Sequence, residues 1–150
     1  MSKRIYLASS WRNQLQPTVL SLLRSQGHEV YDFRHPRPDD VGFGWPQLNL
    51  GDQKSWDVMA FREALEHPVA RRGFKQDYDA MVWADEFCLV LPCGRSAHLE
   101  AGWAIGQGKR TSIYIQALEE PELMYLTGGE RTRICASTDE VLSFHAEAHS

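Results

Sequence analysis

The sequence is poor in the features that mark several classes of protein. Only three of its 150 residues are cysteines, Cys88, Cys93 and Cys135, and no two of them have a CxxC spacing. It therefore predicts neither a disulfide framework nor a zinc site, and we expect reduced, mostly buried thiols. The six histidines show no metal-ligand spacing, so we expect no metal and no cofactor.

Long hydrophobic runs and blocks of positive charge are also missing. No run of about 18 apolar residues occurs, and the N-terminus lacks the core of a signal peptide, which predicts a cytoplasmic protein without membrane contact. Sixteen basic and twenty acidic residues give a formal charge of −4, and no Lys/Arg block exceeds two residues. This composition argues against a nucleic acid polymer as partner and favours a small molecule.

The sequence does contain an alternation of strand and helix patterns. Strands are predicted at residues 3–9, 28–33, 85–92, 110–117 and at the start of 131–148, with helices at 16–27, 55–67, 68–84, 94–109 and the end of 131–148. The apolar run at 85–92 is typical of a central parallel strand covered on both faces. The pattern predicts one domain, residues 1–150, with a three-layer α/β architecture and a mainly parallel sheet of about five strands.

Helix ends are predicted from capping residues. Ser55 is the expected N-cap of the helix at 55–67, and Ser137 or Thr138 that of the last helix. Gly106 or Gly108 is expected to end the helix at 94–109. The "TGGE" at 127–130 predicts a turn.

Residues 34–55 lack any periodicity and include the aromatic residues Phe43 and Trp45. Loops of this length are usually functional or disordered, and the aromatic residues favour a folded lid or pocket wall. Their rings are candidates for stacking on a nucleobase. Packing of the same rings onto their own domain stays an open alternative.

Two acidic residues are candidates for chemistry. Glu100 lies in the first turns of a helix of small and apolar residues, near the carboxyl end of the central strand, where ligands bind in open parallel sheets. Asp77 shares a helical face with Met81 and Ala84, whereas Asp79 points away from it. An acid on an apolar face is unusual unless it is paired or used. The alternative for both acids is an ordinary solvated side chain.

Cationic and hydroxyl side chains follow two of the predicted strands. Such donors, at a helix start or a strand end, suit a phosphorylated ligand. The alternative is that they are ordinary turn residues and solvated side chains. The donors are Ser9, Ser10 and Arg12 after the first strand and Arg95 and Ser96 after the central one.

Three segments, "RIYLASSW", "FKQDYDAMVWADEFCLVLP" and "GRSAHLEAGWAIGQGKRTSIYI", resemble the nucleoside 2-deoxyribosyltransferase superfamily, which includes hydrolases of nucleoside 5′-monophosphates. The resemblance implies a flavodoxin-like (Rossmann-like) fold and a homodimer or higher homo-oligomer. It implies that Glu100 is the nucleophile that attacks the anomeric carbon of the sugar. It further implies that Tyr6 positions this glutamate, and that Asp77 contacts the nucleobase and assists its departure.

The sequence departs from the family six positions before Glu100. Transferases of the family carry an acidic residue there and the monophosphate hydrolases tend to carry serine, whereas this chain has Gly94. The predicted function is cleavage of an N-glycosidic bond, by a hydrolase or a base-exchanging transferase. A glycohydrolase of NAD type and a non-catalytic nucleotide-binding or sensor domain are the alternatives. The candidate substrate-binding residues are Ser9, Ser10, Arg12, Phe43, Trp45, Gly94, Arg95 and Ser96.

Overall fold

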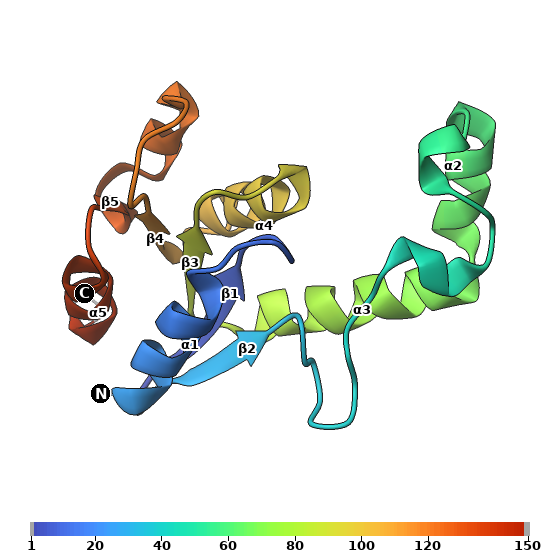
Figure 1. The fold of residues 1–150 in the computed structure, drawn as a ribbon. Coiled ribbons are helices and arrows are strands. Elements are labelled where there is room, and N and C mark those ends of the chain that lie inside the picture. The colour runs from blue at the N-terminus through green and yellow to red at the C-terminus, as the bar shows by residue number, and fades with distance from the viewer. Residues whose placement is uncertain (1, 149–150) are drawn as a thin grey trace. The chain divides into compact units, whose positions relative to one another are not determined.

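The computed structural model describes residues 2–148, and the chain divides into two compact units (Figure 1). Unit 1 comprises Met1–Asp32 and Trp83–Ser150, and unit 2 comprises Phe33–Val82. The prediction of a single domain over residues 1–150 stays a prediction. Each unit is therefore described by itself.

Unit 1 is built on a parallel sheet of five strands. They are β1 (Arg4–Ala8), β2 (Glu29–Asp32), β3 (Glu86–Val90), β4 (Arg110–Tyr114) and β5 (Thr132–Cys135), and their order is β2-β1-β3-β4-β5. Every neighbouring pair is parallel. This is the strand order of the flavodoxin-like fold, in which ligands bind at the carboxyl ends of the strands beside β1 and β3. The predicted fold class is confirmed.

Helices cover both faces of this sheet (Figure 1). The helices are α1 (Gln16–Ser25), α4 (Arg95–Gly106) and α5 (Thr138–Ala146). Ile5 and Leu7 of β1 pack with Leu23 of α1 and Val141 of α5 in one buried cluster. Because successive strand residues point to opposite faces, the side chain of Tyr6 lies on the other face, which α4 covers. The three layers follow from this alternation.

Two helix ends in unit 1 match the signals in the sequence. The Ser137 side chain accepts from the backbone N–H of Glu140 and caps α5, as predicted. Gly108, two residues after α4 ends, has a φ of 77°, which glycine adopts without strain. The predicted turn at 127–130 lies inside a longer 3-10 helix, η3 (Leu123–Arg131), which bends at Gly129. The sequence patterns had missed this element.

Unit 2 contains the long segment without sequence periodicity. It has two short 3-10 helices, η1 (Trp45–Leu48) and η2 (Gln53–Ser55), followed by α2 (Val58–Glu66) and α3 (Pro68–Trp83). The prediction that Ser55 caps the helix is wrong. Asp57 accepts from the backbone N–H of Ala60 at 2.8 Å, because its carboxylate stands directly before the first helical turn while Ser55 ends η2.

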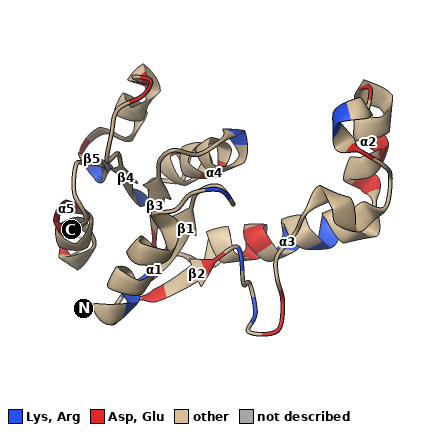
Figure 2. Cartoon of the chain, viewed as in Figure 1, with Lys and Arg blue, Asp and Glu red and all other residues tan. Residues whose placement is uncertain are grey.

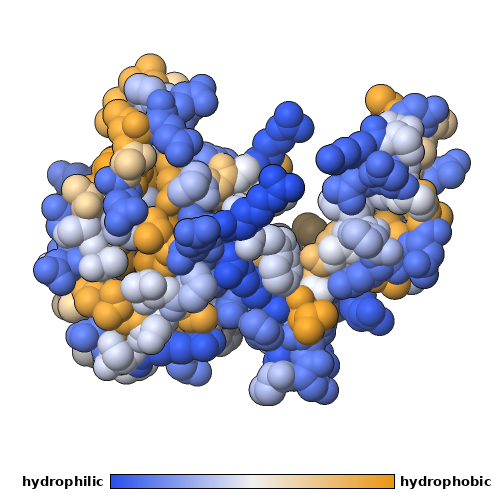
Figure 3. Space-filling view, in the orientation of Figure 1, coloured by the Kyte–Doolittle hydropathy of each residue, from blue (hydrophilic) through white to orange (hydrophobic). Residues whose placement is uncertain are grey.

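Charged residues of both signs are interspersed along the elements of both units (Figure 2). Space-filling atoms show apolar side chains at the surface in several places (Figure 3). Three apolar residues of η3, Leu123, Met124 and Leu126, are 69%, 59% and 76% exposed. Within residues 2–148 no helix is long and apolar enough to cross a membrane. In the same range, no three His, Cys, Asp or Glu side chains are grouped so that they could hold a metal ion.

Candidate active site

The centre of the candidate site is a hydrogen bond between Tyr6 and Glu100. The Tyr6 hydroxyl donates to Oε2 of Glu100 at 2.7 Å, which joins β1 to the second turn of α4. Tyr6 is fully buried, whereas Glu100 is half-buried. One oxygen of the carboxylate is therefore held in place by a donor from the sheet. The resemblance implied that Tyr6 positions Glu100, and this role stays a prediction.

Aromatic neighbours on both sides fix the ring of Tyr6. In the sheet register Tyr6 stands opposite Tyr31 of β2 and Phe87 of β3, so the three rings form a row on the same face. The ring centroids are 5.3 Å apart for Tyr6 and Tyr31 and 4.9 Å for Tyr6 and Phe87, with nearly parallel planes. Sequence analysis missed this row, because only strand register brings Tyr31 and Phe87 beside Tyr6.

Three alanines let α4 approach the sheet closely. Ala97, Ala101 and Ala104 are 2%, 4% and 0% exposed, and they recur at the three- and four-residue spacing of one helical face. Their small side chains bring the backbone of α4 close to the strands. Glu100 directly precedes Ala101. Because α4 packs closely on the sheet, the side chain of Glu100 reaches Tyr6 in β1.

Cys93 is a second nucleophilic group beside Glu100, but its thiol is held protonated. Burial raises the pKa of Cys93 to about 11, and the negative charge of Glu100 adds to the effect. Since the thiolate is the nucleophilic form, Cys93 is a poor nucleophile at neutral pH. Glu100 is the better candidate.

The loop after β1 supplies three of the predicted substrate-binding residues. The hydroxyl of Ser9 is buried and donates to the carbonyl of Val90 at 2.8 Å, which fastens the ends of β1 and β3 together. The hydroxyl of Ser10 accepts from the backbone N–H of Arg12. Arg12 is exposed at the tip of the turn. Their roles in binding a ligand stay predictions, and the hydroxyl hydrogen of Ser9 is already engaged in a structural contact.

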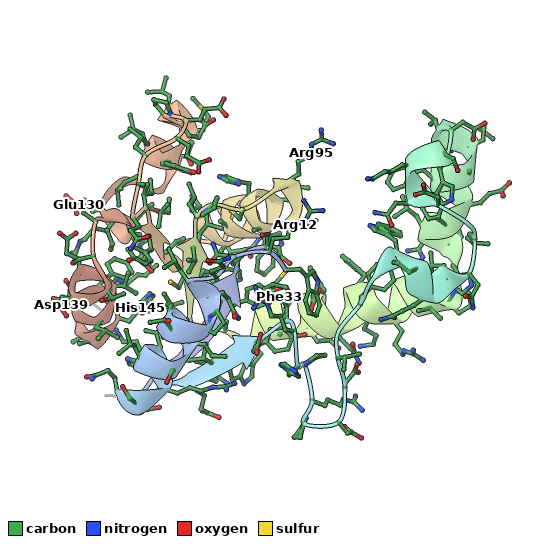
Figure 4. The ribbon with its side chains drawn as sticks, viewed as in Figure 1. Arg12, Phe33, Arg95, Glu130, Asp139 and His145 are labelled. Atoms are coloured by element: carbon green, nitrogen blue, oxygen red, sulfur yellow. The ribbon has the colours of Figure 1, made fainter. Side chains whose placement is uncertain are left out.

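The loop after β3 carries the other predicted donors. Gly94 is the N-cap of α4 and provides no side-chain acceptor for the first backbone N–H groups. Arg95 and Ser96, the next two residues, are exposed. Figure 4 shows Arg12 and Arg95 at the same edge of unit 1, with side chains that leave its surface. Cations and helix N–H groups at one edge suit an anionic ligand.

A pocket of about 380 Å³ opens beside the same end of α4. The loops after β3 and β4 line it together with His98 and Tyr125. Nδ1 of His98 lies 3.1 Å from the carbonyl of Gly94, and its Nε2 lies 2.8 Å from the hydroxyl of Tyr125. Because a carbonyl only accepts, the contact with Gly94 requires a hydrogen on Nδ1. Sequence analysis had left His98 and Tyr125 without a role.

Asp77 belongs to unit 2. It lies on α3 and is half-buried, whereas Asp79 is exposed and pairs with Lys75 at 2.6 Å. Met81, on the same helical face as Asp77, is buried. The different environments of the two aspartates agree with the helical periodicity of the sequence. The part of Asp77 in the reaction stays a prediction.

Phe43 and Trp45 pack into the small core of unit 2. Trp45 makes edge contacts with Phe43, Trp56 and, more distantly, Phe61, with ring centroids 5.0, 5.8 and 6.1 Å apart. The ring of Phe43 lies directly against Gly73 of α3. Both aromatic residues thus have a structural role, which was the alternative that the sequence left open. Their stacking on a nucleobase stays a prediction.

A second group of side chains, Ser112, His145 and Glu86, is arranged like a catalytic triad. Nε2 of His145 is 2.7 Å from the hydroxyl of Ser112, and its Nδ1 is 2.8 Å from Oε1 of Glu86. All three residues are 0% exposed, so no substrate reaches them. Burial alone would raise the pKa of Glu86, but hydrogen bonds and charges, chiefly from His145, Arg110 and Lys3, outweigh it and lower the pKa to about 2. The cluster is structural.

The fold and the Tyr6–Glu100 pair together define a flavodoxin-like α/β protein with a carboxylate on the helix that follows its central strand. No protein-family model and no curated protein matches the chain. Solved structures that share the fold include a 2-deoxyribosyltransferase and a CMP N-glycosidase.

The first of these structures is a 2-deoxyribosyltransferase from Bacillus psychrosaccharolyticus. It is 19% identical, with a TM-score of 0.53 over 95% of this chain and 90% of that chain. The second is a CMP N-glycosidase of Clostridium botulinum, which is 20% identical with a TM-score of 0.53 over 96% of this chain and 98% of that chain. At these identities the likeness shows the fold, and it confirms the fold that the resemblance implied.

Proposed function

We propose that the protein cleaves the N-glycosidic bond of a nucleoside or nucleoside 5′-monophosphate, with Glu100 as nucleophile. The observation that carries this proposal is the hydrogen bond between the Tyr6 hydroxyl and the Glu100 carboxylate. The fold likeness to a 2-deoxyribosyltransferase and to a CMP N-glycosidase supports it. The substrate is therefore a small molecule, and the protein is an enzyme.

The proposed reaction is a double displacement. An oxygen of Glu100 attacks the anomeric carbon, the bond from this carbon to the base nitrogen breaks, and its electron pair leaves with the base. Asp77 is proposed to give the base a proton. Water then attacks the anomeric carbon, passes a proton to Asp77 and releases Glu100. A second nucleobase in place of water would give the transferase reaction.

Tyr6 is proposed to orient one oxygen of Glu100 so that the other faces the sugar. A charge-assisted hydrogen bond of this kind is stronger than a neutral one. The row of rings around Tyr6 keeps the donor in place while the carboxylate changes from anion to ester. Preorganised donors of this type need no rearrangement during the reaction.

The donors at the edge are proposed to hold a 5′-phosphate. Arg12 and Arg95 supply the positive charge, while Ser10, Ser96 and the uncapped start of α4 supply neutral donors. The absence of a side chain at Gly94 leaves this space open, since no atom lies within 4 Å of a Cβ built there. We therefore favour a nucleotide over a nucleoside as substrate.

The experiment that tests the proposal follows free base by chromatography after incubation with nucleosides, 5′-monophosphates and NAD, with and without an acceptor base. The wild type is compared with Glu100→Gln, which keeps the shape of the side chain, and with Glu130→Gln. Glu130 is exposed and lies far from Arg95 in unit 1 (Figure 4). Base release is expected from the wild type and the Glu130 variant, with at least a 1,000-fold loss for Glu100→Gln, about 4 kcal/mol of barrier.

The outcomes separate the alternatives. Release of nicotinamide from NAD, with no base released from the other substrates, would identify the protein as a glycohydrolase of NAD type. Tight nucleotide binding without release of any base would indicate a non-catalytic sensor domain. This alternative stays open because Gly94 stands where relatives carry an acidic residue or serine. Equal rates for wild type and Glu100→Gln would overturn the proposed nucleophile.

We further propose that the protein forms a homodimer or higher homo-oligomer in the cytoplasm. The exposed apolar residues Leu123, Met124 and Leu126 of η3 support association, because exposed apolar surface often marks a contact site. Light scattering coupled to gel filtration measures the mass directly. A single species near the chain mass of 17.2 kDa at micromolar concentration would contradict the oligomer.

A further inference from the structure

One buried side chain joins the two loops of the proposed anion-binding edge. Asn13 ends the turn that carries Arg12 and is 3% exposed. Its Nδ2 donates to the carbonyls of Pro92 at 2.9 Å and Val90 at 3.3 Å. These carbonyls lie at the end of β3 and in the loop that leads to Arg95. A single amide thus connects the loops that follow β1 and β3.

The same amide also holds the turn that leads into α1, which starts at Gln16. Oδ1 of Asn13 accepts from the backbone N–H groups of Leu15 at 2.7 Å and Gln16 at 2.8 Å, two of the donors that a helix start leaves without partners. The position needs an acceptor on one side and a donor on the other. Asparagine supplies both, whereas aspartate has no donor for the two carbonyls.

We infer that Asn13 is a positioning residue that sets the spacing between the turn of Arg12 and the loop of Arg95. The inference rests on the proposed function, in which these two cations hold one phosphate. Arg12 and Arg95 are exposed, so their spacing depends on the backbones beneath them. Misplacement of binding groups by about 1 Å costs up to about 100-fold in rate. Loss of the tie therefore weakens phosphate-bearing ligands more than ligands without phosphate.

The test uses Asn13→Ser, because the serine hydroxyl still offers an acceptor to the N–H groups of Leu15 and Gln16 but is too short to reach Pro92. Base release from a 5′-monophosphate and from its nucleoside is measured, together with inhibition by inorganic phosphate. The KM for the monophosphate and the Ki of phosphate are expected to rise about tenfold. The KM for the nucleoside and kcat at saturation are expected to change less than threefold.

Ser137→Ala is the matched control. It removes the cap of α5, where the Ser137 side chain accepts from Glu140, and thus disturbs a helix start in unit 1 without touching either loop. Its KM values and Ki are expected to equal those of the wild type. Should Asn13→Ser fail to fold, Asn13→Thr keeps a hydroxyl acceptor at this position and fills more of the space.

The outcomes distinguish this inference from the proposed function. Equal increases in both KM values, or an unchanged KM and Ki in the folded variant, would overturn the positioning role. A wild type that releases no base contradicts the proposed function instead. Calorimetric titration with the 5′-monophosphate then decides the inference: about tenfold weaker binding by Asn13→Ser supports it, and equal binding overturns it.

Discussion

Tyr6 and Glu100 stand 94 positions apart in the chain, and a hydrogen bond of 2.7 Å joins their side chains. The ring of Tyr6 lies in a row between Tyr31 and Phe87, so its hydroxyl has little freedom to move. Glu100 is half-buried on a helix whose alanine face is packed on the sheet. The sheet thus provides a rigid donor, and the helix provides the carboxylate that the donor orients.

Tyr6→Phe removes this donor and keeps the ring stack. We expect kcat for base release to fall about 10- to 100-fold, because a hydrogen bond to a charged group contributes about 1.5–3 kcal/mol. The acid limb of the kcat profile should move to higher pH, since the ionised carboxylate loses a donor. Steady-state kinetics from pH 4 to 8 measure both effects.

Tyr114→Phe is the control for this change. Tyr114 is buried in the cluster on the opposite face of the sheet, so loss of its hydroxyl should alter kcat less than twofold. A Tyr6→Phe enzyme with the kcat of the wild type would mean that the hydrogen bond serves the fold alone.

Gly94→Ser should be tolerated and should stabilise the protein slightly. No atom lies within 4 Å of a Cβ at this position, its φ of −95° is open to any residue, and α4 lacks a side-chain cap. Replacing a glycine N-cap with serine contributes a few tenths of a kcal/mol. Urea denaturation measures the change.

Gly108→Ser gives the contrasting result. Its φ of 77° disfavours a side chain, at a cost of roughly 1–2 kcal/mol. If Gly94→Ser proved the more destabilising of the two, the backbone described for the start of α4 would be wrong.

Gly73→Ala should destabilise unit 2 even though alanine favours helices. A Cβ at Gly73 would stand 2.8 Å from Cβ of Phe43, and overpacking of this kind costs about 1–3 kcal/mol, more than the roughly 1 kcal/mol gained in helix propensity. Gly102→Ala in α4, with no atom within 4 Å, should gain that stability. Thermal unfolding midpoints that moved in the same direction for both variants would contradict the contact with Phe43.

Acidification below neutral pH should weaken the fold through His145. Burial lowers the pKa of His145 from its ordinary 6.5, so the folded state binds fewer protons than the unfolded chain. The stabilisation is therefore complete above about pH 6.5 and is lost as the pH falls through the folded pKa, by at most about 1.4 kcal/mol per pH unit. Glu86, whose pKa is about 2, stays ionised between pH 5 and 8.

His145→Gln isolates this effect. Glutamine is able to donate to Glu86 and accept from Ser112 but does not titrate. Denaturation at pH 5, 6, 7 and 8 should show a shallower pH dependence for the variant, with a remainder from His28, whose pKa is lowered by burial and by Lys3. Parallel curves for the two proteins would exclude His145 as the source.

Regular patterns in the sequence predicted much of unit 1. Strands and helices alternate with periods of two and about 3.6 residues, and these patterns located all five strands and the helices of the sheet. The patterns failed at two places. Two candidate capping residues lie close together before α2, and Asp57 rather than Ser55 is the N-cap. The 3-10 helix η3 does not follow the helical period of 3.6 residues, so the sequence patterns missed it. Residues 34–55 have no periodic pattern, and their composition alone does not indicate the short helices η1 and η2.

The sequence by itself determined the alternation of elements and the alanine face of α4, because these depend on residues close together in the chain. Local patterns left Glu100 and Asp77 as two candidate acids, and the role of nucleophile for Glu100 came from the family resemblance. Only the tertiary structure decided which side chains meet. The register of three parallel strands puts Tyr31 and Phe87 beside Tyr6. The side chain of Asn13 donates to the carbonyl of Pro92, which lies 79 residues further along the chain. Such contacts depend on how strands pair and loops close, which no local pattern encodes.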